Sequence, residues 1–140
     1  QGKQSKDEDV KRLIQAKNGN KGSTVVAVKH GEHSLLFTGD MNASRERLLN
    51  NLEHYDVLKV AHHGSRYSSS MKFLEQVQPK VAVISVGAGN RYGHPHAETL
   101  ERLASVGSAV LRTDKQGAIK VTFDDEGIKC YSYVYNPKNF

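Results

Sequence analysis

Short apolar, β-branched runs alternate with segments of helical spacing, and this alternation restricts the fold more than any other feature of the sequence. Strands are expected at 23–29, 34–38, 56–61, 81–86, 109–112, 118–123 and 128–134. Helices are expected after Asp40, from Ser69 or Ser70 to Pro79, and over 97–106. The order β-β-α-β-α-β-α-β-β-β predicts an α/β fold in which helices flank a mixed sheet.

The amino-terminal segment has a different composition from the rest of the chain. Residues 1–22 are polar and are interpreted as a flexible lead-in, with a short helix at about 10–16 as the alternative for that part. The β-branched pattern starts at residue 23, so the folded domain is predicted to span 23–136. A length of 140 residues fits one such domain.

Charge and composition limit the partners and exclude some kinds of site. The net charge is +5 and the isoelectric point about 9.3. This balance permits nucleic acid or another polyanion as a partner, although basic residues spread along a chain are also typical of a solvated surface. The single cysteine, Cys130, excludes an internal disulfide and a multi-cysteine zinc site. No apolar run approaches the ~18 residues of a membrane span, so the piece is expected to be soluble.

Polar side chains follow three of the predicted strands, where a plain turn would not need them. Asp40 ends the second strand, the pair His62-His63 follows the third, and a glycine-rich loop at 87–96 follows the fourth. Alone, an aspartate at a strand end is usually a helix cap or a turn former. Loops at the same strand ends share one edge of a sheet, where ligands bind in layered α/β folds. The three loops are therefore expected to gather into one site.

The residue types at this edge suit metal-assisted chemistry. A carboxylate beside imidazoles suits Zn²⁺ or Mn²⁺, and a carboxylate can bridge two metals ~3.5–4 Å apart, as in phosphoester cleavage. In the third loop, His94 and His96 are candidate proton donors or ligands. Arg91 can pair with a phosphate and Tyr92 can stack on a base, with loop packing as the alternative for both.

Three stretches together resemble a known family. Phe37-Thr38-Gly39-Asp40, residues 56–65 (DVLKVAHHGS) and residues 85–96 (SVGAGNRYGHPH) are similar to the metallo-β-lactamase-like domain of ComEC-type competence proteins. The similarity runs over about 23–123, and phosphocholine esterases of the same fold are close relatives. The resemblance implies the C-terminal half of an αββα sandwich.

The resemblance also implies roles for single residues. Asp40 matches the aspartate that bridges two metals, and His62 matches the late histidine ligand of the second metal. His63 is the alternative ligand, and the sequence does not decide between the two. Ser65 matches a small polar residue behind the histidine pair. Substrate binding is assigned to Ser65, Arg91, Tyr92 and His96. His94 matches a histidine that hydrogen-bonds a phosphate or protonates a leaving group, and is the candidate catalytic residue.

Family members are thought to cleave phosphodiesters. The resemblance therefore implies a metal-dependent hydrolase that uses zinc or manganese and acts on DNA during competence-related uptake. The alternatives are a non-catalytic binding or structural remnant and a phosphocholine-esterase-like cell-wall hydrolase. The location of the parent protein stays open between a membrane-bound and an exported bacterial protein.

One departure from the family pattern is large. The principal ligand motif, His-x-His-x-Asp-His, has no match, because His30 and His33 have the wrong spacing and lie in a predicted hairpin turn. The sequence then supplies only the second half of the domain, as a separate piece, a truncated piece or a remnant. The 140 residues alone are expected to bind metal weakly and to hydrolyse little. The expected partners are the missing N-terminal half and, through an uncovered sheet face, further copies of the half-domain.

Overall fold

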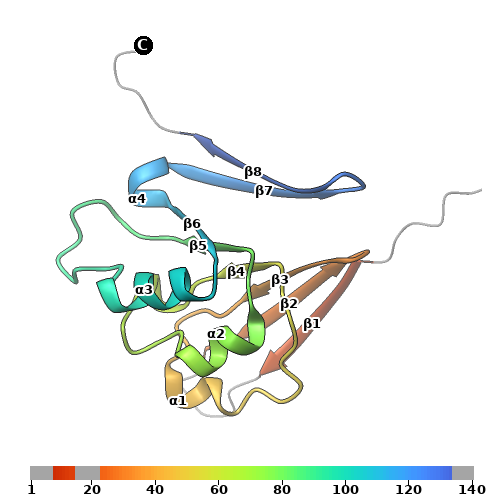
Figure 1. The fold of residues 1–140 in the computed structure, drawn as a ribbon, viewed down its shortest axis with the longest axis horizontal. Coiled ribbons are helices and arrows are strands. Elements are labelled where there is room, and N and C mark those ends of the chain that lie inside the picture. Colours follow the sequence, from red (N-terminus) through yellow and green to blue (C-terminus); the bar gives the residue numbers. More distant parts are fainter. Residues whose placement is uncertain (1–7, 15–22, 134–140) are drawn as a thin grey trace, which may run out of the picture.

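A mixed sheet of six strands forms the centre of the computed structural model, which describes residues 8–14 and 23–133. The strands lie side by side in chain order: β1 (Glu8–Ile14), β2 (Val25–His30), β3 (His33–Phe37), β4 (Val57–Lys59), β5 (Val81–Ile84) and β6 (Ala109–Arg112) (Figure 1). The pairs β1–β2 and β2–β3 are antiparallel, whereas β3 to β6 are parallel. The predicted α/β class with a mixed sheet is confirmed.

Helices cover one face of this sheet. The helices α1 (Ala43–Glu46), α2 (Met71–Val77) and α3 (Ala97–Ser105) connect the parallel strands and lie below the sheet in Figure 1. Crossovers between parallel neighbours have one hand, so successive helices fall on the same face. The core between the layers includes Leu36, Leu58, Ala82 and Ile84 from the sheet and Phe73, Leu74 and Leu103 from the helices.

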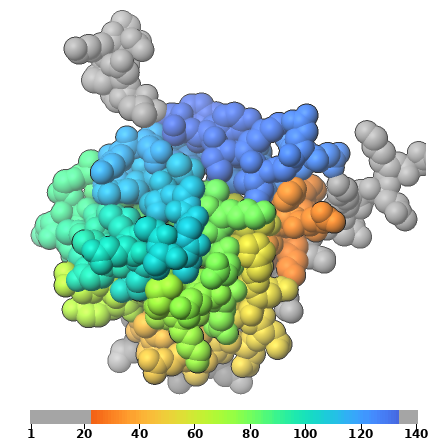
Figure 2. Space-filling view, viewed as in Figure 1, coloured from red at the N-terminus to blue at the C-terminus, as the bar shows by residue number. Residues whose placement is uncertain are grey.

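A hairpin covers the other face. After the short helix α4 (Thr113–Gln116), strands β7 (Ala118–Asp124) and β8 (Gly127–Tyr133) pair and lie across the sheet, on the side away from the three helices (Figure 1; blue in Figure 2). Ile119 and Val121 of β7 and Leu35 and Val57 of the sheet line a cavity of about 340 Å³ between the layers. The layers of helices, sheet and hairpin agree with the predicted half of an αββα sandwich.

The strand expected at 81–86 differs from its prediction. Its run of apolar residues suggests burial on both faces, but β5 ends at Ile84, and within it only Ala82 and Ile84 are fully buried. Val81 and Val83, which alternate with them, are half-buried. The hairpin covers their face of the sheet less completely than the helices cover the opposite face.

Two elements near the amino terminus also differ. Residues 8–14 form β1, not a short helix, and pair with β2, so a strand of the sheet lies before the boundary set at residue 23. The helix after Asp40 is only four residues long, although Leu48, Leu49 and Leu52 have helical spacing. The chain turns there through a left-handed Asn51, at φ 58°. Residues 1–7, 15–22 and 134–136 of the predicted domains lie outside the described residues.

The buried carboxylate of Asp56 ties β3 to the start of β4. It accepts hydrogen bonds from the backbone N–H of Ser34 at 2.9 Å and the ring of His54 at 3.3 Å, and lies 3.5 Å from the Lys80 ammonium. Burial alone would raise the pKa of Asp56, but the hydrogen bonds of Ser34 and His54 and the charge of Lys80 outweigh it. The pKa is therefore lowered.

Within the described residues, no helix has the length and apolar composition needed to cross a bilayer.

Candidate functional site

Hydrogen bonds join the three predicted loops at the carboxyl ends of β3, β4 and β5. The backbone N–H of His62 donates to the carbonyl of Gly39 at 2.9 Å, which places the Gly39-Asp40 turn beside the histidine pair. Nδ1 of His63 lies 2.7 Å from the carbonyl oxygen of Ser85, where the glycine-rich loop begins. The structure therefore brings the three loops to one sheet edge, as the alternation of strands and helices predicts.

The histidine pair lies in an unusual turn. A 3-10 turn, η2 (Ala61–Gly64), follows β4, and within it His62 (φ 48°, ψ 47°) and His63 (φ 55°, ψ 23°) are both left-handed. This conformation costs about 1–2 kcal/mol for a residue with a side chain. Strained backbone of this kind is concentrated at functional sites. The turn leaves both histidines exposed next to the Gly39-Asp40 turn.

A glycine permits the close approach of the histidine turn to the third loop. Gly64 is buried at φ 83°, and a Cβ built on it would lie 2.5 Å from Cβ of Pro95. Its carbonyl accepts a hydrogen bond from the backbone N–H of His96 at 3.0 Å. The backbone of the histidine turn therefore packs directly against residues 95–96, which carry His94 to the site.

Four histidine rings and one tyrosine ring form a cluster. The ring centroid of His94 lies 5.7 Å from that of His62, 6.2 Å from that of His63 and 4.8 Å from that of His96. The ring of Tyr92 stacks on His94 at 5.8 Å. Burial, followed by the neighbouring His96, His62 and His63, lowers the pKa of His94. His94 is therefore expected to be neutral at pH 7, with a ring nitrogen able to accept a proton.

The two candidate ligands differ in how their rings are held. A carbonyl oxygen only accepts hydrogen bonds, so Nδ1 of His63 carries the proton at Ser85 and Nε2 is left as an acceptor. A carbonyl that orients a histidine in this way is the usual support for metal-ligating imidazole. For His62, no ring hydrogen bond is found among the residues that the structure describes. Either ring can therefore offer a nitrogen, and the choice between them stays open.

Neither ring nitrogen of His96 is free to bind a ligand. Its Nδ1 accepts from the backbone N–H of Arg66 at 2.9 Å, and its Nε2 lies 3.2 Å from the carbonyl oxygen of Tyr92, to which it donates. Both ring nitrogens are thus used in joining two loops. The predicted role of His96 in substrate binding is not supported by a free nitrogen, and its position indicates a structural tie.

The remaining predicted residues lie beside the cluster. Ser65 is buried at 3% exposure, and its hydroxyl accepts from the backbone N–H of Tyr67 at 3.3 Å. Its carbonyl accepts from the hydroxyl of Thr99 at 3.0 Å, so Ser65 supports the loop. Arg91 is exposed, and its guanidinium carbon lies 5.8 Å from the centre of the Tyr92 ring.

Lys59 is a site neighbour that the pattern of its strand does not reveal. The sequence suggests an outward-facing lysine, but Lys59 is half-buried and lines the cavity between the sheet and the hairpin, as does Ser85. Burial lowers the pKa of Lys59, and the nearby charge of Asp40 offsets part of this effect. A cationic group therefore lies in a largely apolar cavity next to the predicted metal edge.

Within residues 8–14 and 23–133, no three His, Cys, Asp or Glu side chains are arranged to hold a metal ion. Asp40 and the exposed histidine pair nevertheless offer oxygen and nitrogen donors on adjoining loops. Four ligands are usual for a closed zinc site, and three for a catalytic one. The donors present fit part of a metal site, with further ligands required from elsewhere.

Comparisons with known proteins identify a matching family and several relatives. The family model described as "Metallo-beta-lactamase superfamily" matches residues 1–88. The chain is 41% identical to ComE operon protein 3 of Bacillus subtilis over 107 residues, and 43% identical to Recombination protein 2 of Haemophilus influenzae over 105 residues, covering 74% of this chain in both cases. It is 37% identical to Competence protein ComA of Neisseria gonorrhoeae over 131 residues, which is 86% of this chain. The matches span 14%, 13% and 19% of those proteins.

Proposed function

The chain belongs to the metallo-beta-lactamase superfamily, and on that premise we propose that it is one half of a metal-dependent phosphodiesterase that acts on DNA, and that it bears part of the metal ligands. The observation that carries the proposal is the meeting of Asp40, His62, His63 and His94 at one sheet edge. The competence and recombination proteins among the relatives support a nucleic acid substrate.

In this proposal Asp40 and one or both exposed histidines hold zinc or manganese. The metal would polarise the phosphodiester and lower the pKa of bound water. The remaining ligands come from a segment outside these 140 residues, which is the proposed partner of this half. His94 would then accept a proton from the attacking water, because its lowered pKa keeps the ring neutral near pH 7, and would return a proton to the leaving oxygen.

Lys59 fits the same proposal. Its side chain lines the cavity beside the site, and its ammonium donates to the carbonyl of Val60 at 3.4 Å, next to the histidine turn. A cation there favours the negative charge that builds up on a phosphate during cleavage. We assign Lys59 an electrostatic role toward the phosphate.

Metal content tests the proposal directly. Tag-free protein and its Asp40→Ala variant are each equilibrated with zinc or manganese and desalted, and bound metal is measured by mass spectrometry. The proposal predicts bound metal, below one ion per chain, that falls in the variant, with Asp125→Ala as a control that leaves it unchanged. Equal metal in wild type and Asp40→Ala would contradict the role of Asp40. No metal in any of the three would favour a binding or structural remnant of the fold.

A further inference from the structure

Two exposed tyrosines lie on loops that side-chain hydrogen bonds hold in place. Tyr67 is 71% exposed and Tyr92 is 67% exposed, and each follows an arginine, Arg66 or Arg91. Tyrosine is intermediate in its tendency to be buried, so exposure alone assigns these residues no role. The support given to these two loops is therefore the feature that calls for an explanation.

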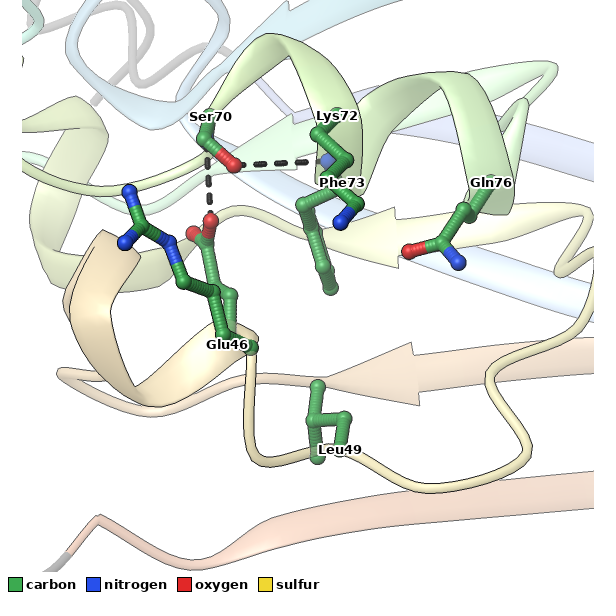
Figure 3. A pocket seen from close by; sticks show the side chains of 7 residues that line it. Glu46, Leu49, Ser70, Lys72, Phe73 and Gln76 are labelled. Carbon is green, nitrogen blue, oxygen red and sulfur yellow. Dashed lines mark hydrogen bonds between the residues drawn. The ribbon is translucent and has the colours of Figure 1, made fainter.

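The loop that carries Tyr67 has no unpaired backbone group between the Arg66 and Ser69 peptides. The carboxylate of Glu46 accepts the backbone N–H group of Ser69 and, as Figure 3 shows, that of Ser70. From α3, the guanidinium of Arg102 donates to the carbonyls of Arg66, Ser68 and Ser69 at 2.9–3.1 Å.

The peptide groups of Tyr67 itself are also held. Its carbonyl accepts from Ala43 at 2.9 Å, and its N–H donates to the Ser65 hydroxyl. Glu46 is buried at 5% exposure, so a desolvated carboxylate is used only to fix this backbone. The pocket next to Glu46, between α1 and α2, includes none of the predicted site residues in its lining (Figure 3).

The loop that carries Tyr92 is held by one side chain. The amide nitrogen of Asn90 donates to the carbonyls of Gly87 and His94 at 3.0 and 2.8 Å. Its amide oxygen accepts the N–H groups of Tyr92 and His94 at 3.2 and 3.0 Å. The imidazole of His96 then joins the two loops, because it accepts from Arg66 and donates to Tyr92.

A rigid support for an exposed aromatic ring lowers the entropic cost of using that ring in binding. An aromatic ring beside a guanidinium suits a ligand with a flat base and a phosphate, and base stacking requires a base that is not already paired in a duplex. The arginines disfavour a cationic ligand such as choline, for which tyrosine rings alone would also be suitable. Arg66 pairs with Glu98 at 3.2 Å, but an exposed pair of this kind exchanges readily with a phosphate.

We propose that Tyr67 and Tyr92, set in place by His96, form a stacking platform that selects unpaired nucleotides for the adjoining histidine cluster. This inference rests on the proposed function and narrows its substrate to a single strand. Glu46, Asn90, His96 and Arg102 are positioning residues in this scheme, since they hold the two loops and do not contact the ligand.

Binding in EDTA tests the platform without metal-dependent cleavage. The probes are a fluorescein-labelled oligothymidylate and a hairpin duplex of equal charge, and fluorescence anisotropy at fixed salt gives Kd. Wild type is expected to prefer the single strand. Tyr67→Ala and Tyr92→Ala are each expected to weaken single-strand binding by roughly 5- to 100-fold and to leave duplex binding unchanged. Tyr67→Phe and Tyr92→Phe should bind like wild type, because the ring and not the hydroxyl stacks.

Tyr131→Ala is the matched control, because Tyr131 is a 45% exposed tyrosine on β8 and lies in a strand instead of a tied loop. The proposal is overturned if the alanine variants bind the single strand like wild type, if Tyr131→Ala weakens binding equally, or if wild type binds both probes equally or neither. Circular dichroism verifies that each variant is folded. Because these measurements contain no metal, their failure is separate from a failure of the Asp40→Ala metal test.

Discussion

Replacement of Gly64 by alanine tests the packing of the histidine turn against the third loop. Gly64 is left-handed at φ 83°, and an added Cβ would lie 2.5 Å from Cβ and 3.0 Å from Cα of Pro95. The left-handed conformation costs alanine about 1–2 kcal/mol, and forcing an extra carbon into a packed contact typically costs about 1–3 kcal/mol. The two effects together predict a loss of roughly 2–5 kcal/mol in the free energy of unfolding.

Two other glycines separate these effects. Gly89 is also left-handed, at φ 63°, but its Cβ would meet no atom within 4 Å, so Gly89→Ala should cost only about 1–2 kcal/mol. Gly87 has neither a left-handed φ nor a neighbour within that distance, and Gly87→Ala should change stability by less than about 0.5 kcal/mol. Urea unfolding followed by circular dichroism gives all three values.

The difference in stability loss between Gly64→Ala and Gly89→Ala tests whether the contact with Pro95 is tight. If Gly64→Ala costs no more than Gly89→Ala, the contact with Pro95 is not a tight one and the reasoning fails. If it costs more, ring signals of the site histidines in NMR spectra should also shift in Gly64→Ala and stay in place in Gly87→Ala. The second readout links the packing defect to the geometry of the cluster.

Three further predictions concern single side chains. Arg102→Lys leaves carbonyls of the 65–70 loop without donors, so it should destabilise the fold by about 1–3 kcal/mol and speed amide exchange in that loop, and unchanged exchange would refute this. Because the pKa of Asp56 is lowered by folding, its contribution to stability is complete above the unfolded value near 4 and is lost as the pH falls through the folded value. Asp56→Asn should therefore unfold with a weaker pH dependence between about pH 5 and pH 2, and an unchanged slope would contradict the assignment. In metal-free protein, the ring of His94 should titrate below about pH 6.5 by NMR, and a midpoint at or above that value would contradict its burial.

The sequence predicts the arrangement of the site better than its details. Asp40, the pair His62-His63 and the loop at 87–96 follow predicted strands, and the expectation that such strand ends share one edge of the sheet is enough to gather them. The roles of His62 and His63 could not be separated, because two left-handed residues in succession, 48° and 55° in φ, have no local signal apart from the following glycine. The tie formed by His96 depends on Arg66, which is 30 positions away, so no local pattern indicates it.

The errors in the fold have related causes. Leu48, Leu49 and Leu52 have helical spacing, yet α1 ends after four residues at Glu46, whose carboxylate contacts the 69–70 backbone from a distant part of the sequence. The strand β1 was missed because a polar composition outweighed the apolar residues in it, and only pairing with β2 identifies it. Lys59 looked like a surface residue because its environment is formed by the β7–β8 hairpin, some sixty positions later in the chain.

The strand order of the sheet has a consequence for how the site assembles. Since consecutive strands are neighbours, each parallel pairing closes only the short segment between them, and such closures carry a small entropic cost. The three loops of the site follow β3, β4 and β5, so the histidine cluster can assemble as these strands pair one after another. This assembly needs neither β1, which lies at one edge of the sheet, nor the hairpin that covers the opposite face.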